Sequence, residues 1–589
     1  MTSSETSSLI WSIAEILRSS YNEHEYGDVV LTFVVLRRLD CLLEPTKEKV
    51  FAAHKRFEGS TLHDGMCRKA SEQAFYNTSR FMTLADLVDE PDALLANLMD
   101  YVRGFSEDVR DVFDKFKFEA TAQGLDDKDL LFHVVSTMAG VDLSPDYVDN
   151  ARMGDIYEEL LRRFSEMSNE TAGEHFSPRD GLALAVDLVT ANSADDLMTP
   201  GRVVKCYDPC CGTGGALTAF EDRVAAMNPR AYVRVFGQEV NDQTFAMCKA
   251  DMLIKGQNPA NVRFGDTLSD DRFPAETFGY QVSNPPYGVD WKKDRRAVDA
   301  EAKRGFAGRF GAGTPRVSDG QLLFVEHMVS KMRSKKEGGA RVAVFLNGSP
   351  LFTGGAGSGE SEIRRWLLES DLVDAIVAMP NDFFYNTGIA TYVWVLDNDK
   401  PAERRRKVQL INANGVYTRM RKSLGSKRNE LTEEQRRQIV DAYEAYRESD
   451  VCRILDVADL GYTTVTVERP LRDEKGEPVL DRRGRPKPDK SLRDTENVPL
   501  KEDVDEYLER EVRPYAPDAW ADRSLDKVGY EIPFTRYFYR YEPLRPSSEI
   551  LAEIRELEES ISEKLERAMG RGRSPIPGWM TCRVRGGGV

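Results

Sequence analysis

The sequence lacks an uninterrupted apolar run near the roughly 18 residues that a membrane-spanning helix needs. Its first residues, Met1 to Glu5, lack a basic segment followed by a long apolar one, so we expect no secretory signal. Only eight cysteines occur in 589 residues, and no CxxC pair is present. The sequence therefore predicts neither a zinc site nor a disulfide framework. We expect no metal, no membrane contact and a reducing, cytoplasmic location.

The chain also lacks a positive net charge, because its formal charge at pH 7 is -17. Affinity for duplex DNA leans on phosphate neutralisation, so we do not expect this chain to grip nucleic acid alone through a broad basic surface. Local basic clusters exist, such as Lys292-Lys293, Arg295-Arg296 and Arg404 to Lys407. They are either solvated faces or part of a positive surface that a partner completes, and the sequence leaves both open.

No phosphate-binding GxxxxGK[ST] pattern and no GxGxxG spacing is present, but one glycine-rich turn is. The apolar run Val203 to Tyr207 leads into Asp208-Pro209-Cys210-Cys211-Gly212-Thr213-Gly214-Gly215 and then a helical stretch. A strand, a glycine-rich turn and a helix form the first unit of a nucleotide-type α/β sheet. The glycines allow close approach of a ligand, and Asp208 suits a cationic amino group. Because no lysine follows them, we expect an adenosine without phosphates that bears an amino acid.

Two further strand-like runs end in carboxylates. The run Val233 to Phe236 ends near Glu239, which is placed to bind two ribose hydroxyls. The run Val262 to Phe264 precedes Asp266, a candidate acceptor for an adenine amino group. Ligands of open α/β sheets bind at the carboxyl ends of strands, so we expect both carboxylates near the glycine-rich turn.

A fourth strand-like run leads into Ser283-Asn284-Pro285-Pro286-Tyr287-Gly288. Proline fixes φ and removes backbone donors, so this turn is stiff and its carbonyls are available. The Asn284 side-chain oxygen and the Pro285 carbonyl can accept from one planar amino group, while Tyr287 stacks on the ring that carries it. Alone, the turn is equally well a proline-rich surface turn. The carboxylates at the neighbouring strand ends favour the functional interpretation.

The segment Gly173-Glu174-His175-Phe176-Ser177-Pro178 precedes a helical run from Gly181 to Thr190. Ser-Pro before a helix is typical of its N-terminus. An aromatic ring at that place suits an adenosine-like ligand. A plain capping segment is the alternative.

The pattern of apolar and polar residues along the chain predicts three structural parts. Residues 1–165 predict a helical domain, with apolar residues such as Leu31, Val34, Val35 and Leu39 at helical spacing. Residues 166–425 predict an α/β domain with a doubly wound, mostly parallel sheet, because short β-branched runs alternate with helical ones. Residues 426–589 predict a C-terminal helical region. It includes an exposed, mobile insert at about 468–497 and a charged helix at about 547–569.

Three segments leave alternatives open. The loop at 289–317 either orders over DNA or is a disordered surface insertion. The aromatic cluster that contains Phe384 either packs internally or stacks on a base. The narrow apolar seam of the helix at 547–569 suits either a partner helix or its own domain.

The motifs in this order resemble those of amino-methyltransferases that use S-adenosylmethionine, and of DNA adenine methyltransferases in particular. The wider chain resembles the modification subunit of type I restriction–modification systems. The resemblance is also carried by Glu25 to Leu31, Leu36 to Asp40, Ser318 to Phe324, Phe345 to Gly357, Phe384 to Ile389 and Tyr530 to Tyr537. The sequence departs from the family at Cys210, where a small residue is more usual, and in the insert after Arg472.

The resemblance implies a phage-defence enzyme that transfers a methyl group from S-adenosylmethionine to the N6 amine of adenine in duplex DNA, with Phe384 as a second stacking ring. It implies a specificity subunit that the C-terminal helices clasp, two modification chains per specificity chain, and a restriction subunit. The expected cofactor-binding residues are Glu174, His175, Phe176, Ser177, Pro178, Asp208, Gly212, Thr213, Gly214, Gly215, Glu239, Asp266 and Asn284. A protein glutamine or RNA amine as acceptor, and a non-catalytic scaffold, stay open.

Overall fold

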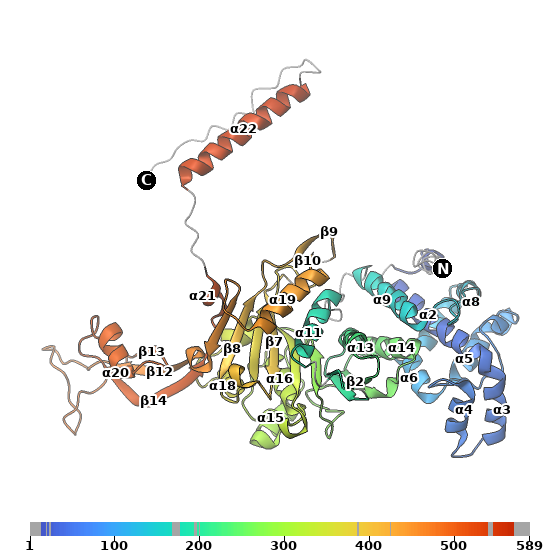
Figure 1. Cartoon of the computed structure of the whole chain (residues 1–589), viewed down its shortest axis with the longest axis horizontal. Helices are drawn as coiled ribbons and strands as arrows, with labels where there is room; N and C mark the ends of the chain where they lie inside the picture. The colour runs from blue at the N-terminus through green and yellow to red at the C-terminus, as the bar shows by residue number, and fades with distance from the viewer. Residues whose placement is uncertain are drawn as a thin grey trace. The chain divides into compact units, whose positions relative to one another are not determined.

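The computed structural model describes residues 13–18, 20–22, 25–167, 177–193, 197–199, 201–385, 388–424, 426–539 and 546–569 (Figure 1). The chain divides into two compact units, Met1–Tyr537 and Phe538–Val589. Across the described ranges, no helix combines the length and apolarity needed to cross a membrane.

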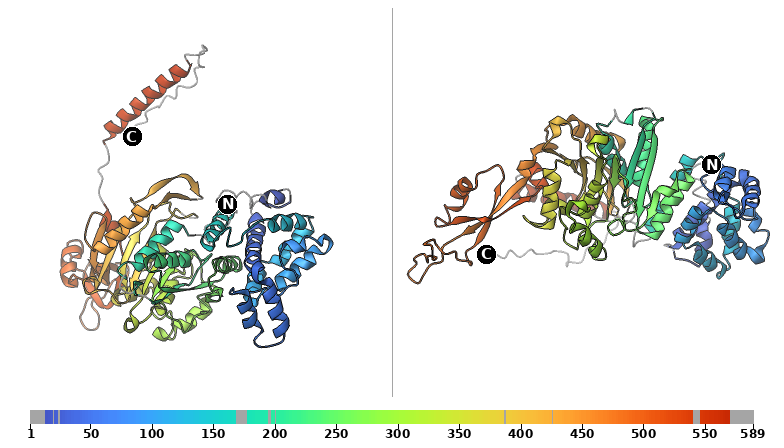
Figure 2. Two further views of the ribbon diagram at one scale, coloured as in Figure 1. Left: turned by 45° about the vertical axis from the view of Figure 1, so that its right-hand side comes forward. Right: turned by 90° about the horizontal axis from the view of Figure 1, so that it is seen from below.

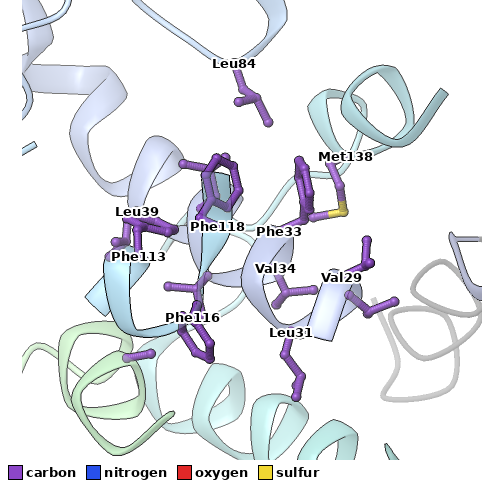
Figure 3. Packing of buried hydrophobic residues seen from close by; sticks show 14 of the residues in the cluster. Val29, Leu31, Phe33, Val34, Leu39, Leu84, Phe113, Phe116, Phe118 and Met138 are labelled. Carbon is purple, nitrogen blue, oxygen red and sulfur yellow. The ribbon is translucent and has the colours of Figure 1, made fainter. Parts of the chain in front are cut away.

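The N-terminal part is helical, as the sequence predicts, and helix α2 (Tyr26–Leu43) lies at its centre. Every residue of α2 except Asp28 is buried. A helix that is buried on all sides belongs inside a core, and Figure 3 shows side chains such as Phe113, Phe118 and Met138 around it. The surrounding helices are α3 (Lys47–Phe57), α4 (His63–Ser71), α5 (Leu94–Arg103), α6 (Glu107–Lys115), α7 (Phe118–Asp126), α8 (Leu131–Ala139) and α9 (Asn150–Met167).

The central element is a nine-stranded sheet in the order β11-β8-β6-β7-β5-β4-β1-β2-β3. Its strands are β1 (Val203–Asp208), β2 (Tyr232–Glu239), β3 (Val262–Phe264), β4 (Tyr280–Ser283), β5 (Arg341–Asn347), β6 (Val373–Ala378), β7 (Thr391–Asp397), β8 (Lys407–Asn412) and β11 (Cys452–Asp456). Strand β7 is antiparallel to both of its neighbours, and β11 is antiparallel to β8. The other pairs are parallel, which confirms the predicted mostly parallel sheet.

Helices cover both faces of this sheet (Figures 1 and 2). One face packs against α11 (Arg179–Thr190), α13 (Gly215–Met227), α14 (Asp242–Ile254) and α19 (Glu433–Ala445). The other packs against α16 (Gln321–Ser330), on which lie α15 (Arg295–Ala302) and α18 (Gly359–Glu369), with the short α17 (Ser349–Phe352) between β5 and α18. Helix α14 also contributes Ala246, Ala250, Leu253 and Ile254 to the N-terminal core, so it joins the helical part to the sheet.

The C-terminal part contains more strand than the helical region that the sequence predicts. The central sheet continues past residue 425 to β11, after the hairpin β9 (Thr418–Leu424) and β10 (Lys427–Glu430). A second sheet, β13-β12-β14, then follows, with β12 (Gly461–Glu468), β13 (Asp494–Pro499) and β14 (Trp520–Tyr530). Five of the eight residues of β12 are valine or threonine, whose branched side chains favour a pleated strand. The helices here are α20 (Val504–Tyr507), α21 (Phe534–Phe538) and, in the second unit, α22 (Ser547–Met569).

Candidate active site

The residues that the sequence places at strand ends line one cavity of about 660 Å³. The cavity lies at the carboxyl ends of β1, β2, β3 and β4. Its lining includes Asp208, Glu239, Asp266 and the turn from Asn284 to Tyr287. Parallel strands bring their carboxyl ends to the same edge, which explains why residues nearly 80 positions apart meet here.

Asp208 is the buried acid of this cavity. Its Oδ1 accepts hydrogen bonds from the Ser283 hydroxyl at 2.7 Å and from the Cys210 backbone N–H at 2.9 Å. These bonds favour the charged form, but burial opposes them more strongly and raises the pKa of Asp208 to about 7. A carboxylate in this position would be stabilised by a cationic group in the cavity.

The glycine-rich turn between β1 and α13 contains two glycines with positive φ. Gly214 has φ of +90°, and a Cβ there would lie 2.8 Å from the sulfur of Cys248. Gly212 also has a positive φ, of 52°. Glycine alone adopts these angles without strain, so the backbone lies bare against the cavity.

Glu239 holds the glycine-rich turn against the end of β2. One carboxylate oxygen accepts from the Gly212 N–H at 2.8 Å, and the other accepts from Val240 and Asn241 at 3.0 and 2.8 Å. Each carboxylate oxygen has two lone pairs, so these backbone bonds leave acceptor capacity for ligand hydroxyls.

Asp266 is engaged on both oxygens. Oδ1 accepts from the Leu268 N–H at 3.0 Å, and Oδ2 lies 2.7 Å from the ammonium group of Lys293. Lys293 belongs to the loop at 289–317, for which the sequence leaves order and disorder open. The structure describes this loop as ordered and includes α15 within it. The interpretation as a disordered insertion is therefore wrong, while contact with DNA stays a prediction.

Arg309 fixes that loop to the cavity wall. Its guanidinium group donates to the carbonyls of Thr267 and Leu268 at 2.6 and 2.9 Å and pairs with the carboxylate of Glu301. Because these carbonyls directly follow Asp266, the anchor sets the wall on which Asp266 lies. The sequence does not indicate this anchor, because the carbonyls of Thr267 and Leu268 are 42 and 41 positions away from Arg309 in the chain.

The turn after β4 presents Asn284 with a fixed amide. Its Nδ2 donates to the Ser177 hydroxyl at 2.8 Å, and its Oδ1 accepts from the hydroxyl of Tyr287. Pro285 is buried and Pro286 is exposed. The acceptor oxygen that the sequence assigns to a target amine is thus engaged by Tyr287 in this structure. The sequence does not indicate the hydrogen bond from Asn284 to Ser177, because the two residues are 107 positions apart.

Phe384 lines the same cavity from the loop between β6 and β7. It is buried, and its ring meets the ring of Tyr287 edge-on, with centroids 6.2 Å apart and planes at 88°. Two perpendicular rings cannot both lie parallel to one base. A base stacks on one of them in this arrangement, or one ring turns.

The remaining predicted site residues fall in two groups. Ser177, Gly212, Thr213 and Gly215 line the cavity, and Pro178 and Gly214 directly adjoin lining residues. Glu174, His175 and Phe176 lie outside the described residues. In the part of the chain that the structure describes, no group of three or more His, Cys, Asp or Glu side chains is arranged to hold a metal.

Two family models match this chain. Residues 148–469 match the model described as N-6 DNA Methylase, and residues 6–138 match the HsdM N-terminal domain. The first match covers more than half of the chain.

Curated relatives carry the names of methylase subunits. The chain is 24% identical over 461 residues to the type I restriction enzyme MjaIX methylase subunit of Methanocaldococcus jannaschii, covering 75% of this chain and 77% of the relative. It is 26% identical over 308 residues to the MpnII methylase subunit of Mycoplasma pneumoniae, covering 50% of this chain and 52% of the relative.

Solved structures share the fold. The type I restriction–modification methyltransferase subunit from Streptococcus thermophilus superposes with a TM-score of 0.61 at 21% identity, over 78% of this chain and 97% of that chain. A modification subunit of a putative type I restriction enzyme from Vibrio vulnificus gives 0.53 at 15% identity, over 86% and 98%.

Proposed function

The chain belongs to the N-6 DNA methylase family, and on that premise we propose that it methylates the N6 amine of adenine in duplex DNA with S-adenosylmethionine as donor. We further propose that it acts as the modification subunit of a type I restriction–modification system, as the names of its relatives suggest. The observation that carries the proposal is that one cavity combines two kinds of binding surface. Three carboxylates and a glycine-rich turn adjoin an amide–proline turn and two aromatic rings.

The carboxylate side of the cavity fits S-adenosylmethionine. Asp208 is a buried acid whose raised pKa calls for a cationic partner, which the amino group of the ligand's amino-acid part provides. Glu239 retains acceptor capacity for ribose hydroxyls, and the bare backbone from Gly212 to Gly215 admits a ligand closely. Asp266 stands where the adenine amino group would be received. When bound, S-adenosylmethionine supplies an activated methyl group on sulfur.

The amide side of the cavity fits the acceptor. The lone pair of an aromatic amine is delocalised into its ring, so the amine is a poor nucleophile. We propose that Asn284 Oδ1 and the Pro285 carbonyl accept its two hydrogens, which localises the lone pair on nitrogen. The target amine would then displace the Tyr287 hydroxyl from Asn284, and the Tyr287 ring would be freed to stack. Orientation and preorganised dipoles supply the rate gain without a covalent intermediate.

The target base must leave the duplex to reach this cavity. Extrusion costs a few kcal/mol, which stacking and hydrogen bonds in the pocket offset. Tyr287 and Phe384 supply the aromatic surface, and because their rings are perpendicular the base stacks on one of them, or one ring reorients when the base arrives.

Replacing Asn284 by alanine tests the assignment. The variant should lose methyl transfer by at least about 100-fold, because an oriented acceptor at the reacting nitrogen is worth several kcal/mol. Calorimetry should show nearly unchanged binding of S-adenosylmethionine. The matched control is Asn258→Ala, at an exposed asparagine that caps a short turn outside the cavity lining. Retained transfer of tritiated methyl groups by the Asn284 variant would refute the role.

The C-terminal helix α22 is the proposed contact to a specificity subunit. Its seam of Ile550, Ile554, Leu557, Ile561 and Leu565 is between 43% and 62% exposed, which is unusual for large apolar side chains. We propose that this seam, in two modification chains per specificity chain, packs on helices of that subunit, and that a restriction subunit completes the complex. We place the complex in the cytoplasm, with the DNA.

Co-purification tests the partner proposal. Chains encoded beside this gene should co-purify with the native protein and be lost from the variant Ile554→Glu/Ile561→Glu. Methylome sequencing of cells with and without the gene would show adenine methylation at one motif. Unchanged co-purification by the variant would rule out the seam as the contact.

A further inference from the structure

The segment between β12 and β13 contains two turns of the same pattern, eight residues apart. The first is Asp473-Glu474-Lys475-Gly476-Glu477-Pro478, and the second is Asp481-Arg482-Arg483-Gly484-Arg485-Pro486. Both share the spacing Asp-x-x-Gly-x-Pro. The repeat makes the two turns directly comparable.

The two turns have the same backbone scaffold. In the first, Asp473 Oδ1 accepts from the N–H groups of Lys475 and Glu477, both at 2.9 Å. In the second, Asp481 Oδ1 accepts from Arg483 and Arg485 at 2.7 and 3.0 Å. The glycine of each turn has a positive φ, 81° at Gly476 and 76° at Gly484. The aspartate and the glycine therefore determine the turn, and the residues between them are free to vary.

A closed set of backbone bonds holds the turns together. The Leu471 N–H donates to the Lys487 carbonyl at 2.8 Å, Val479 to Leu471 at 2.7 Å, and Lys487 to Val479 at 2.8 Å. Three short extended segments, around Leu471, Val479 and Lys487, are thus hydrogen-bonded to one another in pairs. We call residues 469–493 the three-run tip. The tip extends the sheet of β12, β13 and β14 at its outer end (Figures 1 and 2).

The two turns carry opposite charge. Residues 473–477 hold three acids and one lysine, a net charge of -2, whereas residues 481–485 hold three arginines and one aspartate, a net charge of +2. Arg482, Arg483 and Arg485 are exposed, as are Lys487 and Lys490 nearby. Oδ1 of Asp481 accepts from the backbone of its own turn, and its Oδ2 lies 3.5 Å from the guanidinium group of Arg485, so Arg482 and Arg483 are the arginines of the turn that do not face this carboxylate. The first turn shows that the scaffold does not need the arginines.

The sheet that carries the three-run tip is attached to the central sheet at the carboxyl ends of its strands, where the cavity lies. The Ile532 N–H, just after β14, donates to the carbonyl of Leu351 at 2.8 Å, in the segment that follows the carboxyl end of β5. Strand β5 is the neighbour of β4, which leads into Asn284. From this edge, the eight residues of β12 reach about 26 Å, roughly the length of eight base pairs.

We propose that the turn Asp481–Arg485, with Lys487 and Lys490, binds phosphates of the duplex away from the extruded base. Guanidinium groups suit phosphate oxygens, and this turn gathers three exposed arginines within four residues of a chain whose net charge is -17. The inference rests on the proposed function, because the duplex is its substrate. The turn fixes the position of the DNA backbone and reads no sequence.

The test exchanges the charge of the second turn for that of the first. The variant Arg482→Glu/Arg485→Glu takes the residues found at the equivalent positions of the first turn, so the scaffold tolerates them. The matched control is Lys335→Glu/Lys336→Glu. This exposed pair precedes β5 and therefore lies at the amino-terminal end of that strand, away from the cavity. Each full-length variant is purified with the chains that accompany it. Fluorescence anisotropy with a 40-base-pair duplex between 50 and 250 mM salt gives the affinity.

The arginine variant should bind the duplex at least about ten-fold more weakly at 100 mM salt, and the slope of log affinity against log salt should fall by about two. The lysine variant should match the unmodified protein. Equal affinity and slope for all three would overturn the phosphate contact and leave methyl transfer untouched. Loss of an accompanying chain without loss of DNA affinity would also overturn it, in favour of a protein partner. Failure of the unmodified complex to methylate any duplex would instead refute the proposed function.

Discussion

The ammonium group of Lys427 lies 3.1 Å from a carboxylate oxygen of Asp180 and 3.8 Å from the centre of the Phe383 ring. Lys427 is buried, and Asp180 also accepts from the Leu431 N–H at 2.8 Å. One cation therefore ties the start of α11 to the loop that carries Phe383 and Phe384.

This pair closes a ring of contacts around the cavity. Phe383 meets Phe384 edge-on at 5.6 Å, Phe384 meets Tyr287, and Tyr287 donates to Asn284. Asn284 in turn donates to Ser177, three residues before Asp180. This closed chain of contacts joins elements that are nearly 250 positions apart in the sequence. It therefore positions the aromatic rings relative to the Asn284 amide.

Replacing Lys427 by methionine should impair methyl transfer beyond its effect on stability. The substitution leaves the partly buried carboxylate of Asp180 unpaired, which costs about 3–5 kcal/mol in comparable pairs. The aromatic loop then loses its anchor, so we expect kcat to fall more than ten-fold with a smaller change in the affinity for S-adenosylmethionine. The control Lys249→Met removes a lysine with similar surroundings, 3.1 Å from Asp111 and 5.1 Å from the Phe245 ring. Equal kcat values at equal stability loss would contradict a positioning role.

Binding of S-adenosylmethionine should strengthen as the pH rises towards 7. The pKa of Asp208 is raised to about 7 by burial, so below pH 7 the carboxyl is mostly protonated and cannot pair with a cation. The affinity should fall by up to ten-fold per pH unit below 7 and level off above it. Calorimetry from pH 5.5 to 8.5 measures this, and Asp208→Asn should bind weakly at every pH. A flat profile for the unmodified protein would exclude Asp208 as the partner of the amino group.

The raised pKa of Asp208 also makes the stability of the folded protein depend on pH. Between the ordinary pKa of an aspartate and about 7, the folded protein holds a proton that the unfolded chain has lost. The contribution of Asp208 to stability therefore decreases as the pH rises through this window. Denaturant unfolding of Asp208→Asn should be less dependent on pH there than that of the unmodified protein.

The ring and the hydroxyl of Tyr287 should have separable effects. In Tyr287→Phe the ring remains, and the hydroxyl that engages Asn284 Oδ1 is gone, so we expect transfer within a few-fold of the unmodified rate. In Tyr287→Ala the stacking surface is lost, which is worth about 1–3 kcal/mol per base. Steady-state kinetics with a duplex substrate distinguishes the two. Equal losses in both variants would assign the role to the hydroxyl.

Arg309 should matter much more than Arg304, although both pair with Glu301. The Arg309 side chain is only 10% exposed and also bonds two backbone carbonyls, whereas the Arg304 side chain is 58% exposed and lies 3.4 Å from Glu301. We expect Arg309→Met to lower the free energy of unfolding by about 3–5 kcal/mol and to weaken S-adenosylmethionine binding by loosening the wall at Asp266. Arg304→Met should cost less than about 1 kcal/mol. Similar effects from both, by denaturant unfolding and calorimetry, would contradict the anchor.

Local sequence patterns were enough for the elements around the glycine-rich turn and for much of the site, but not for the strands of the C-terminal part. A strand, a glycine-rich turn and a helix are encoded within about 25 residues, so Asp208 and Gly212 to Gly215 could be placed without a structure. The same holds for the amide–proline turn, because proline restricts the backbone regardless of its surroundings. The rule that strand ends share an edge then brought Glu239, Asp266 and Asn284 together. The helical spacing of Leu31, Val34, Val35 and Leu39 likewise predicts a helix, which the structure places in the N-terminal core.

Only the tertiary structure decided which distant groups became partners. Lys427 with Asp180, Ser177 with Asn284, and Arg309 with the carbonyls after Asp266 each join residues 41 or more positions apart. The insertion of antiparallel β7 between β5 and β6, and the addition of β11 beyond residue 425, are also choices of strand neighbour. The type of a residue and its local spacing determine which kinds of group it can bond. Which of many equivalent partners it meets depends on how the whole chain excludes water from its core, and no short stretch of sequence carries that information.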